Sequence, residues 1–95
     1  MFKTNIFMNT KLLLCVKGIE DVDCLFSSAD ARKLIRNFNN ATAIELDFSG
    51  IEAIGDEFAH ELFIVWRKEN PESTIAVVKA CESVETAISR VLKAR

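Results

Sequence analysis

Four side chains able to take part in acid–base or metal chemistry stand close together near the middle of the chain. Asp56, Glu57, His60 and Glu61 follow directly after Gly55, and His60 is the only histidine. Glu57 and His60 have the Glu-x-x-His spacing of carboxylate-bridged metal sites. Those sites need further glutamates and a second histidine, which only a dimer of this chain would supply. We therefore expect no metal ion and no cofactor, and interpret these residues as a solvated polar helix face.

Covalent or phosphate chemistry is also weakly indicated. A nucleophilic triad would need His60 as its base, but the sequence has no G-x-S-x-G elbow. It also has no Walker loop and no G-x-G-x-x-G fingerprint to hold a phosphate. We predict no catalytic residue and expect that the protein is not an enzyme.

A turn between a strand ending at Phe48 and a helix starting near Asp56 must position these acids. Asp47 and Ser49 are predicted to satisfy backbone groups of the turn. Gly50 and Gly55 suit a positive φ or a close approach of two backbones. Asp56 and Glu57 should also stabilise the helix N-terminus, by about 0.3–1 kcal/mol each.

The helix after this turn has an apolar arc and a polar arc, because each residue advances the helix by about 100°. The predicted core arc, with its last two members partly exposed at the edge, contains Phe58, Ala59, Leu62, Val65, Phe63 and Trp66. The opposite arc contains Asp56, Glu57, His60, Ile64, Arg67 and Lys68. Ile64 is the one apolar residue among charged ones. Asp56, Glu57, His60 and Ile64 are therefore the candidate partner-binding residues.

The remaining elements are predicted from local patterns. Strands are expected over residues 2–8 and 12–16, joined as a possible hairpin by Asn9-Thr10, and residues 18–23 form an acidic connection. A helix capped by Ser27 or Ser28 follows, with an apolar stripe of Ala31, Leu34, Ile35 and Phe38, and ends at Asn39-Asn40. Strands over 43–48 and 74–78 flank the helix that stops before Asn70-Pro71. The strand over 74–78 should be covered on both faces. Ser83 is expected to cap the last helix.

This order, β-β-α-β-α-β-α, indicates an α/β domain over residues 1–95. The net charge is −2, with Lys and Arg scattered, so a nucleic-acid partner is not expected. No apolar run approaches the roughly 20 residues that cross a bilayer. Cys15, Cys24 and Cys81 form no C-x-x-C pair, and we expect buried, reduced thiols in a cytoplasmic protein.

The central segment also resembles a known family. Leu46-Asp47-Phe48-Ser49-Gly50-Ile51, then Ile54-Gly55, Phe58-Ala59 and Glu61-Leu62 are similar to the signature of a bacterial family of small STAS-like domains of unknown function. Leu25-Phe26-Ser27 and Ala31-Arg32-Lys33-Leu34 resemble its first-helix entry, and Val84, Ile88 and Val91 resemble its last helix. The similarity extends over roughly residues 24–92.

The resemblance implies a fold and a kind of function. It implies a STAS-like α/β domain with about four strands in a mixed sheet and two to three packed helices. The strand-to-helix turn of such domains docks onto a partner, often an ATP-binding kinase-like protein. In anti-sigma-factor antagonists, a serine at the start of this helix is phosphorylated, which breaks the complex.

At that place Asp56 and Glu57 stand where the family often has serines, and His60 stands where it usually has an acid. Together, two carboxylates carry a charge close to that of a phosphoserine, which is roughly −1.5 to −2. The predicted function is a non-enzymatic regulatory module that docks a partner through Gly55–Ile64 without this phosphorylation switch. The alternative is a structural building block whose homodimer uses Trp66 and the N-terminal strand.

Overall fold

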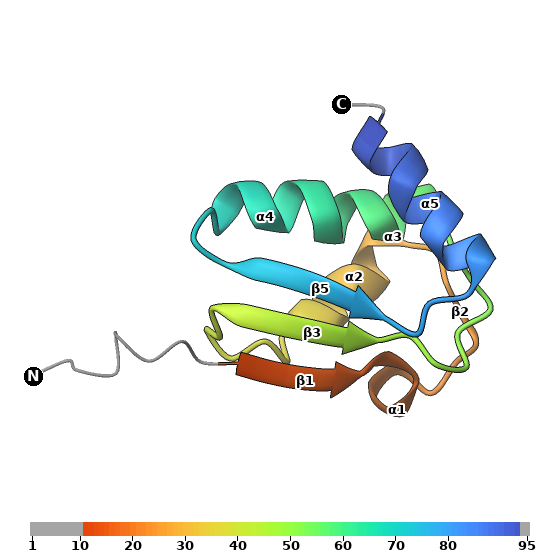
Figure 1. The fold of residues 1–95 in the computed structure, drawn as a ribbon, viewed down its shortest axis with the longest axis horizontal. Helices are drawn as coiled ribbons and strands as arrows, with labels where there is room; N and C mark the ends of the chain where they lie inside the picture. Colours follow the sequence, from red (N-terminus) through yellow and green to blue (C-terminus); the bar gives the residue numbers. More distant parts are fainter. Residues whose placement is uncertain (1–10, 94–95) are drawn as a thin grey trace, which may run out of the picture.

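The computed structural model describes residues 11–93, so the strand predicted over 2–8 lies outside the described residues. The element order is β1 (Lys11–Cys15), α1 (Val16–Glu20), β2 (Cys24–Leu25), α2 (Ser28–Ile35), β3 (Ala43–Asp47), β4 (Ala53–Ile54), α3 (Asp56–His60), η2 (Glu61–Val65), α4 (Trp66–Glu69), β5 (Thr74–Val78) and α5 (Glu82–Lys93). Strands and helices alternate as expected, and the α/β class is confirmed (Figure 1).

The main sheet has the order β1-β3-β5, and both of its strand pairs are parallel. All three arrows therefore point the same way in Figure 1, and their carboxyl ends meet at one edge of the molecule. Between parallel strands the chain returns through a crossover connection, usually a helix. Because all three strands run in the same direction, the turns that follow them, including the one after β3, are gathered at that edge.

Helices cover one face of this sheet. Ile44 and Leu46 of β3 are buried in the core, and Leu12 and Leu14 of β1 pack against it at the same register. The intervening residue Leu13 is 63% exposed on the opposite face. Side chains alternate between the two faces of a strand, so one layer of helices leaves every second residue open.

Two sequence predictions about burial are therefore wrong. The apolar run over 12–16 is not a buried strand, because β1 is exposed on alternate residues. The strand over 74–78 is not covered on both faces either. β5 lies at the edge of the described sheet, and its residues Thr74 and Ala76 are exposed.

Residues 16–25 also differ from the prediction. The end of the predicted strand and the start of the acidic connection form the short helix α1, with Val16 fully buried at its start. After it, β2 pairs in parallel with β4, in register Cys24↔Ala53 and Leu25↔Ile54. This small second pair ties the chain before α2 to the chain before α3.

The three segments α3, η2 and α4 follow one another without a break between Asp56 and Glu69. The middle segment is a π-helical turn, in which the Trp66 amide bonds to the Glu61 carbonyl. Phe63 and Trp66 are only 6% and 9% exposed, so the prediction that they are partly exposed is wrong. Trp66 instead makes an edge-to-face contact with Phe38, with ring centroids 5.0 Å apart.

The local signals at helix ends are confirmed only in part. The Ser27 oxygen accepts from the Asp30 amide, and Asp30 reaches back to the Ser27 amide as a capping box. Asn39 and Asn40 have positive φ angles of 51° and 61°, but the prediction that the helix extends through Phe38 to them is wrong, because α2 ends at Ile35. The prediction for Ser83 is wrong, because α5 begins at Glu82 and Ser83 lies in its first turn.

The cysteines are free thiols, but the prediction that they are buried is wrong: Cys15 and Cys81 are exposed and Cys24 is half-buried.

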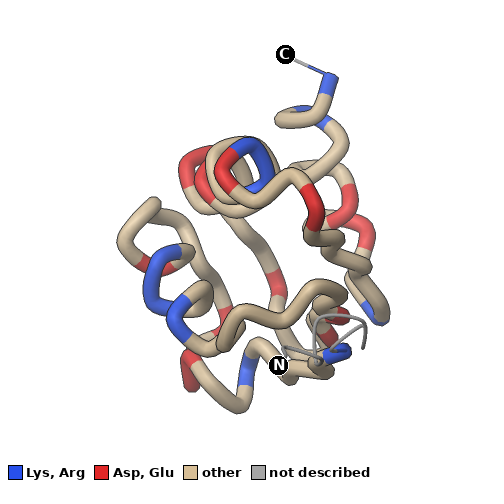
Figure 2. The backbone as a smooth tube through the Cα atoms, turned by 90° about the vertical axis from the view of Figure 1, so that its left-hand side faces the viewer, with Lys and Arg blue, Asp and Glu red and all other residues tan. Residues whose placement is uncertain are grey.

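Basic and acidic residues are spread over several elements of the tube in Figure 2. Among residues 11–93, no helix is long and apolar enough to cross a membrane.

Candidate functional site

The turn after β3 is fixed by short-range hydrogen bonds. The Asp47 carboxylate accepts from the Ser49 amide at 2.8 Å. Hydrogen bonds from the Ser49 hydroxyl and amide hold the pKa of Asp47 below its ordinary value. Gly50 has a φ of +82°, which a residue with a side chain adopts only with strain. The roles predicted for Asp47 and Gly50 are therefore seen in the structure, whereas Ser49 bonds to the Asp47 carboxylate and, among the described residues, not to a backbone group.

Gly55 permits a close contact between two loops. Its amide donates to the Leu25 carbonyl at 2.8 Å, and the Phe58 amide donates to the Phe26 carbonyl at 3.2 Å. A Cβ atom on Gly55 would lie only 3.1 Å from both the Cα and the carbonyl oxygen of Phe26. Gly55 thus lets the β2–α2 loop lie directly against the start of α3, and the Phe26 carbonyl satisfies one of the free amides there.

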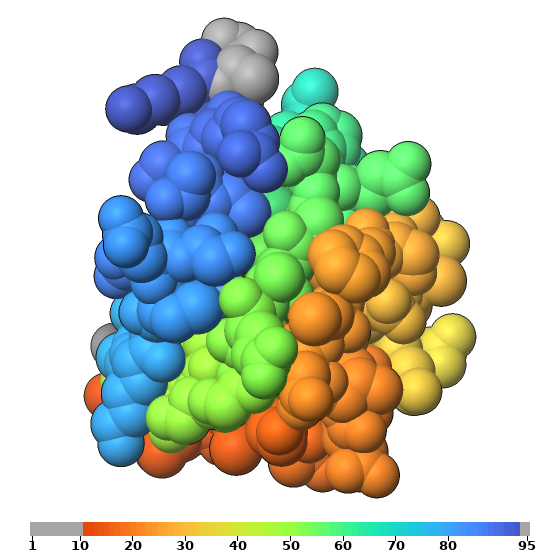
Figure 3. Space-filling view, turned by 90° about the vertical axis from the view of Figure 1, so that its right-hand side faces the viewer, coloured from red at the N-terminus to blue at the C-terminus, as the bar shows by residue number. Residues whose placement is uncertain are grey.

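These loops form one continuous face of the molecule. Figure 3 views the molecule toward the carboxyl ends of the strands and shows three chain segments side by side. They are the orange segment leading into α2, the green segment leading into α3 and the blue segment leading into α5. The Cys81 thiol joins two of them, because its Sγ lies 3.6 Å from the carbonyl oxygens of Ile51 and Glu52.

Asp56 is paired across this face with a residue of α5. Arg90 donates to one Asp56 carboxylate oxygen from Nη2 at 2.8 Å and from Nε at 3.1 Å. Both side chains are more than half exposed, so this pair contributes little to stability. Its main effect is to hold the carboxylate in one place and to partly neutralise its charge.

Glu57 and His60 are exposed and available. Within residues 11–93, neither side chain takes part in a hydrogen bond or an ion pair. Both line a hollow of about 370 Å³ together with Ser28, Asp56, Glu61, Arg90 and Val91. Glu61 faces α2, where its Oε2 lies 3.7 Å from Arg32 Nη1.

A family comparison bears on this site. Residues 30–85 match the model of a family described as a STAS-like domain of unknown function. That range is more than half of the 95-residue chain. The chain belongs to this STAS-like family. No curated protein matched the chain, and no solved structure matched it.

The matched range of this STAS-like domain includes Asp47, Ser49, Gly50 and Gly55 and all the predicted partner-binding residues. It does not include Arg90, which holds Asp56. The α/β fold and the family predicted from the sequence are thus confirmed together.

The structure brings three of the four predicted partner-binding residues together and sets one slightly apart. Asp56, Glu57 and His60 line the hollow beside Arg90. Ile64 lies one turn further along the helix, in a second hollow that His60 also lines. Ile64 is half-buried and packs against the core, so it is less isolated than its sequence context indicated.

Sequence reasoning missed Phe26 and Arg90. Phe26 is 57% exposed beside Gly55 in the STAS-like turn region. Its only local signal was its place directly before the Ser27 cap, where an apolar residue usually packs onto the following helix. Arg90 near the end of the last helix gives no local signal of this role, because no sequence pattern links it to Asp56, which lies 34 positions away.

The site also offers little for metal binding. Among the described residues, no group of three or more His, Cys, Asp and Glu side chains is arranged to hold a metal ion. Glu57 and His60 alone leave most of a coordination shell unfilled. The arrangement instead presents an exposed aromatic ring, a free carboxylate and an imidazole on a fixed turn.

Proposed function

We propose that this STAS-like domain is a non-enzymatic protein-interaction module. It docks a partner through the Gly55–Ile64 surface, and the partner class favoured by the family resemblance is an ATP-binding kinase-like regulator. Asp56, Glu57 and His60 contact the partner at the hollow beside Arg90, and Ile64 extends the contact along the helix.

The observation that carries the proposal is the exposure of Phe26 on a rigid support. The ring is more than half exposed, although the Phe26 carbonyl is hydrogen-bonded to the start of α3. Aromatic side chains that are held in place and ringed by polar groups are typical binding hot spots. Phe26 adjoins Gly55 and thus extends the predicted surface with an apolar anchor.

The acids at the start of α3 support a surface that does not switch by phosphorylation. Neither Asp56 nor Glu57 has a hydroxyl for a serine kinase to modify. Arg90 holds the Asp56 carboxylate, whereas Glu57 has no ion-pair partner within residues 11–93. We propose that a partner recognises this permanent negative charge at the position where related domains have a serine.

Partner capture in the source cells tests the proposal. The tagged chain is expressed there, captured proteins are identified by mass spectrometry, and the affinity of the leading candidate is then measured with purified proteins. Phe26→Ser and Glu57→Lys should each weaken binding by about ten-fold or more, because each removes or reverses a central contact.

Leu13→Ser is the matched control, because Leu13 is as exposed as Phe26 but lies on the open face of the sheet. It should leave partner affinity unchanged. Full binding by Phe26→Ser, Glu57→Lys and His60→Ala together would show that the partner uses another surface.

The alternative, a homo-oligomeric building block, is favoured by one observation. Leu13 is 63% exposed on the open sheet face, whereas Trp66 is buried and does not serve as the predicted dimer contact. Light scattering at high concentration decides between the two. A dimer that Leu13→Ser dissociates would support this alternative, and a strict monomer would rule it out.

A further inference from the structure

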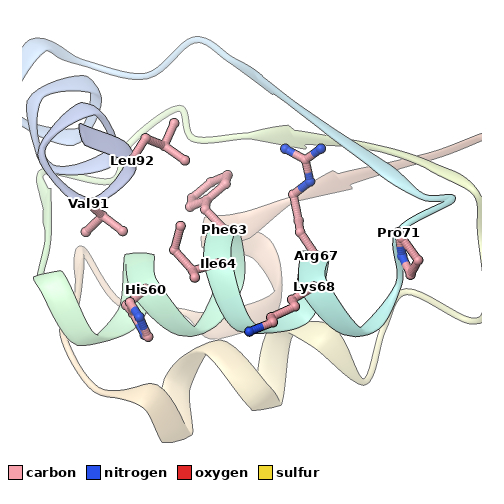
Figure 4. Close-up of a pocket in the computed structure, with 8 residues that line it drawn as sticks. All are labelled: His60, Phe63, Ile64, Arg67, Lys68, Pro71, Val91 and Leu92. Carbon is pink, nitrogen blue, oxygen red and sulfur yellow. The ribbon is translucent and has the colours of Figure 1, made fainter. Parts of the chain in front are cut away.

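A second hollow runs along the helix beside the proposed docking surface. Its volume is about 590 Å³, and we call it the helix groove. One wall comes from η2 and α4, and the other from the end of α5 (Figure 4). The residues on which the inference rests are His60, Phe63, Ile64, Arg67, Lys68 and Leu92.

The floor of the helix groove is apolar. The segments α3, η2 and α4 form one continuous helix, which we call the long helix. In Figure 4, Ile64 and Phe63 project into the space between this helix and Leu92 of α5. Leu92 is 41% exposed, although its side chain is large and apolar. An occupant that covers Leu92 and Ile64 would remove apolar surface from water, which favours binding.

The far end of the groove is positively charged, and the described part of the chain places no counter-charge there. Arg67 and Lys68 are both exposed, and neither makes an ion pair or a side-chain hydrogen bond within residues 11–93. Among the described residues, no carboxylate lines the groove. By contrast, Arg32 and Arg90 each face a carboxylate of the long helix. The groove therefore complements an anionic, apolar occupant.

The dimensions suit a short stretch of polypeptide. From His60 to Lys68 the groove follows the helix for about 12 Å, at 1.5 Å per residue. That length accommodates about two turns of a helix or about four extended residues. Of the lining residues that the structure describes, the basic ones are Arg67 and Lys68 at the α4 end, whereas Asp56 and Glu57 line the neighbouring hollow that shares His60.

We infer that the helix groove binds a short amphipathic segment of a partner protein. Its apolar side chains pack on Ile64 and Leu92, and its carboxylates pair with Arg67 and Lys68. This inference rests on the proposed function, because Ile64 and His60 belong to both surfaces. It adds the chemistry of the partner segment, which carries both acidic and apolar residues and places its acids at the α4 end of the helix groove.

Selection from a random twelve-residue peptide library on the immobilised full-length chain tests the inference. Enriched peptides should carry Asp or Glu within one helical turn of Leu, Ile or Phe. Their affinity should fall by about ten-fold or more in Arg67→Glu and in Leu92→Ser. Lys33→Glu is the matched control, since it makes the same change of charge at an exposed site on α2 and should leave the affinity unchanged.

Other outcomes overturn the inference. Enrichment of basic or uncharged peptides, or of none, would show that the groove does not bind acidic segments. If the peptides bind Arg67→Glu normally but lose affinity for Phe26→Ser, the proposed docking surface stands and the groove inference fails. Self-association that Arg67→Glu abolishes would show that the occupant is a second copy of this chain.

Discussion

Individual side chains in this protein take their roles from partners that lie far away in the sequence. Asp56 is held by Arg90, Glu61 lies near Arg32, and Glu57 next to them has no partner among the described residues. Three carboxylates and one imidazole that look similar in the sequence thus divide into groups with a partner and groups without one among the described residues. Glu57 and His60, which have no partner within the described range 11–93, are available for contact with another molecule.

Glu20 carries a prediction at this scale. It is only 7% exposed, and its Oε2 atom is buried without a hydrogen-bond partner within the described residues. Burial raises the pKa of Glu20 above its ordinary value of 4.5, against a smaller opposing effect of Lys33. The charged form is therefore disfavoured in the folded state relative to the unfolded state.

The sign of the pH effect follows. The folded state binds this proton more tightly, so Glu20 costs stability as pH rises from about 4.5 through the raised pKa. Glu20→Gln should increase the free energy of unfolding at pH 7 by about 1 kcal/mol. The gain should shrink below pH 4.5, as urea titrations at several pH values would show. Glu72→Gln, at an exposed turn position, is the control, and an equal gain there would contradict the explanation.

At the scale of elements, the site depends on how two turns meet. The turn after β3 is closed locally by Asp47, Ser49 and Gly50. The start of α3 is instead fixed by the backbone of the β2–α2 loop, which the small β2–β4 pair brings alongside. The proposed docking surface therefore needs both turns, although only the first is visible as a motif.

Gly55→Ala tests this contact between the turns. The added Cβ would lie 3.1 Å from backbone atoms of Phe26, which have little freedom to move. We expect the free energy of unfolding to fall by about 1–3 kcal/mol, together with weaker partner binding. Urea denaturation measures the first effect.

Gly18→Ala is the control for this substitution, because a Cβ at Gly18 meets its nearest neighbours at an ordinary 3.7 Å. Gly18 lies within α1, where alanine is favoured over glycine by roughly 0.5–1 kcal/mol. The two variants should thus change stability in opposite directions. A loss of similar size in both would show that the Phe26 contact is not the cause.

For the whole molecule, the main feature is a sheet with one covered and one open face. The helices supply a single core, while Leu13 and its neighbours on the other face remain exposed. The proposed docking surface lies at the carboxyl ends of the strands, on the same helices that cover the core, and the open face of the sheet is a separate surface.

Hydrogen exchange should reflect this arrangement. β3 is hydrogen-bonded on both sides, and its Ile44 and Leu46 are buried. Its amides should exchange most slowly of the three strands, because they open only when the sheet itself opens. Mass spectrometry of peptides from β1, β3 and β5 makes the comparison. Equally slow exchange in β1 would show that a further strand pairs with its outer edge.

The sequence alone determined the features that depend on neighbouring residues. The positions of β1, β3 and β5, the Ser27 capping box, the left-handed Asn39 and Asn40 and the turn with Gly50 follow from local patterns of residues, whereas the short strands β2 and β4 were not predicted. The pattern of residues 46–62 was also sufficient to indicate the STAS-like family, which the family comparison confirms.

Tertiary structure alone decided which surfaces are available. The open face of β1, the burial of Trp66 against Phe38, the exposure of Phe26 beside Gly55 and the pairing of Asp56 with Arg90 all join distant segments. An apolar run such as 12–16 indicates a strand, but it does not say whether a second layer covers it. Such contacts depend on how the helices pack on the sheet, and no local pattern records that packing.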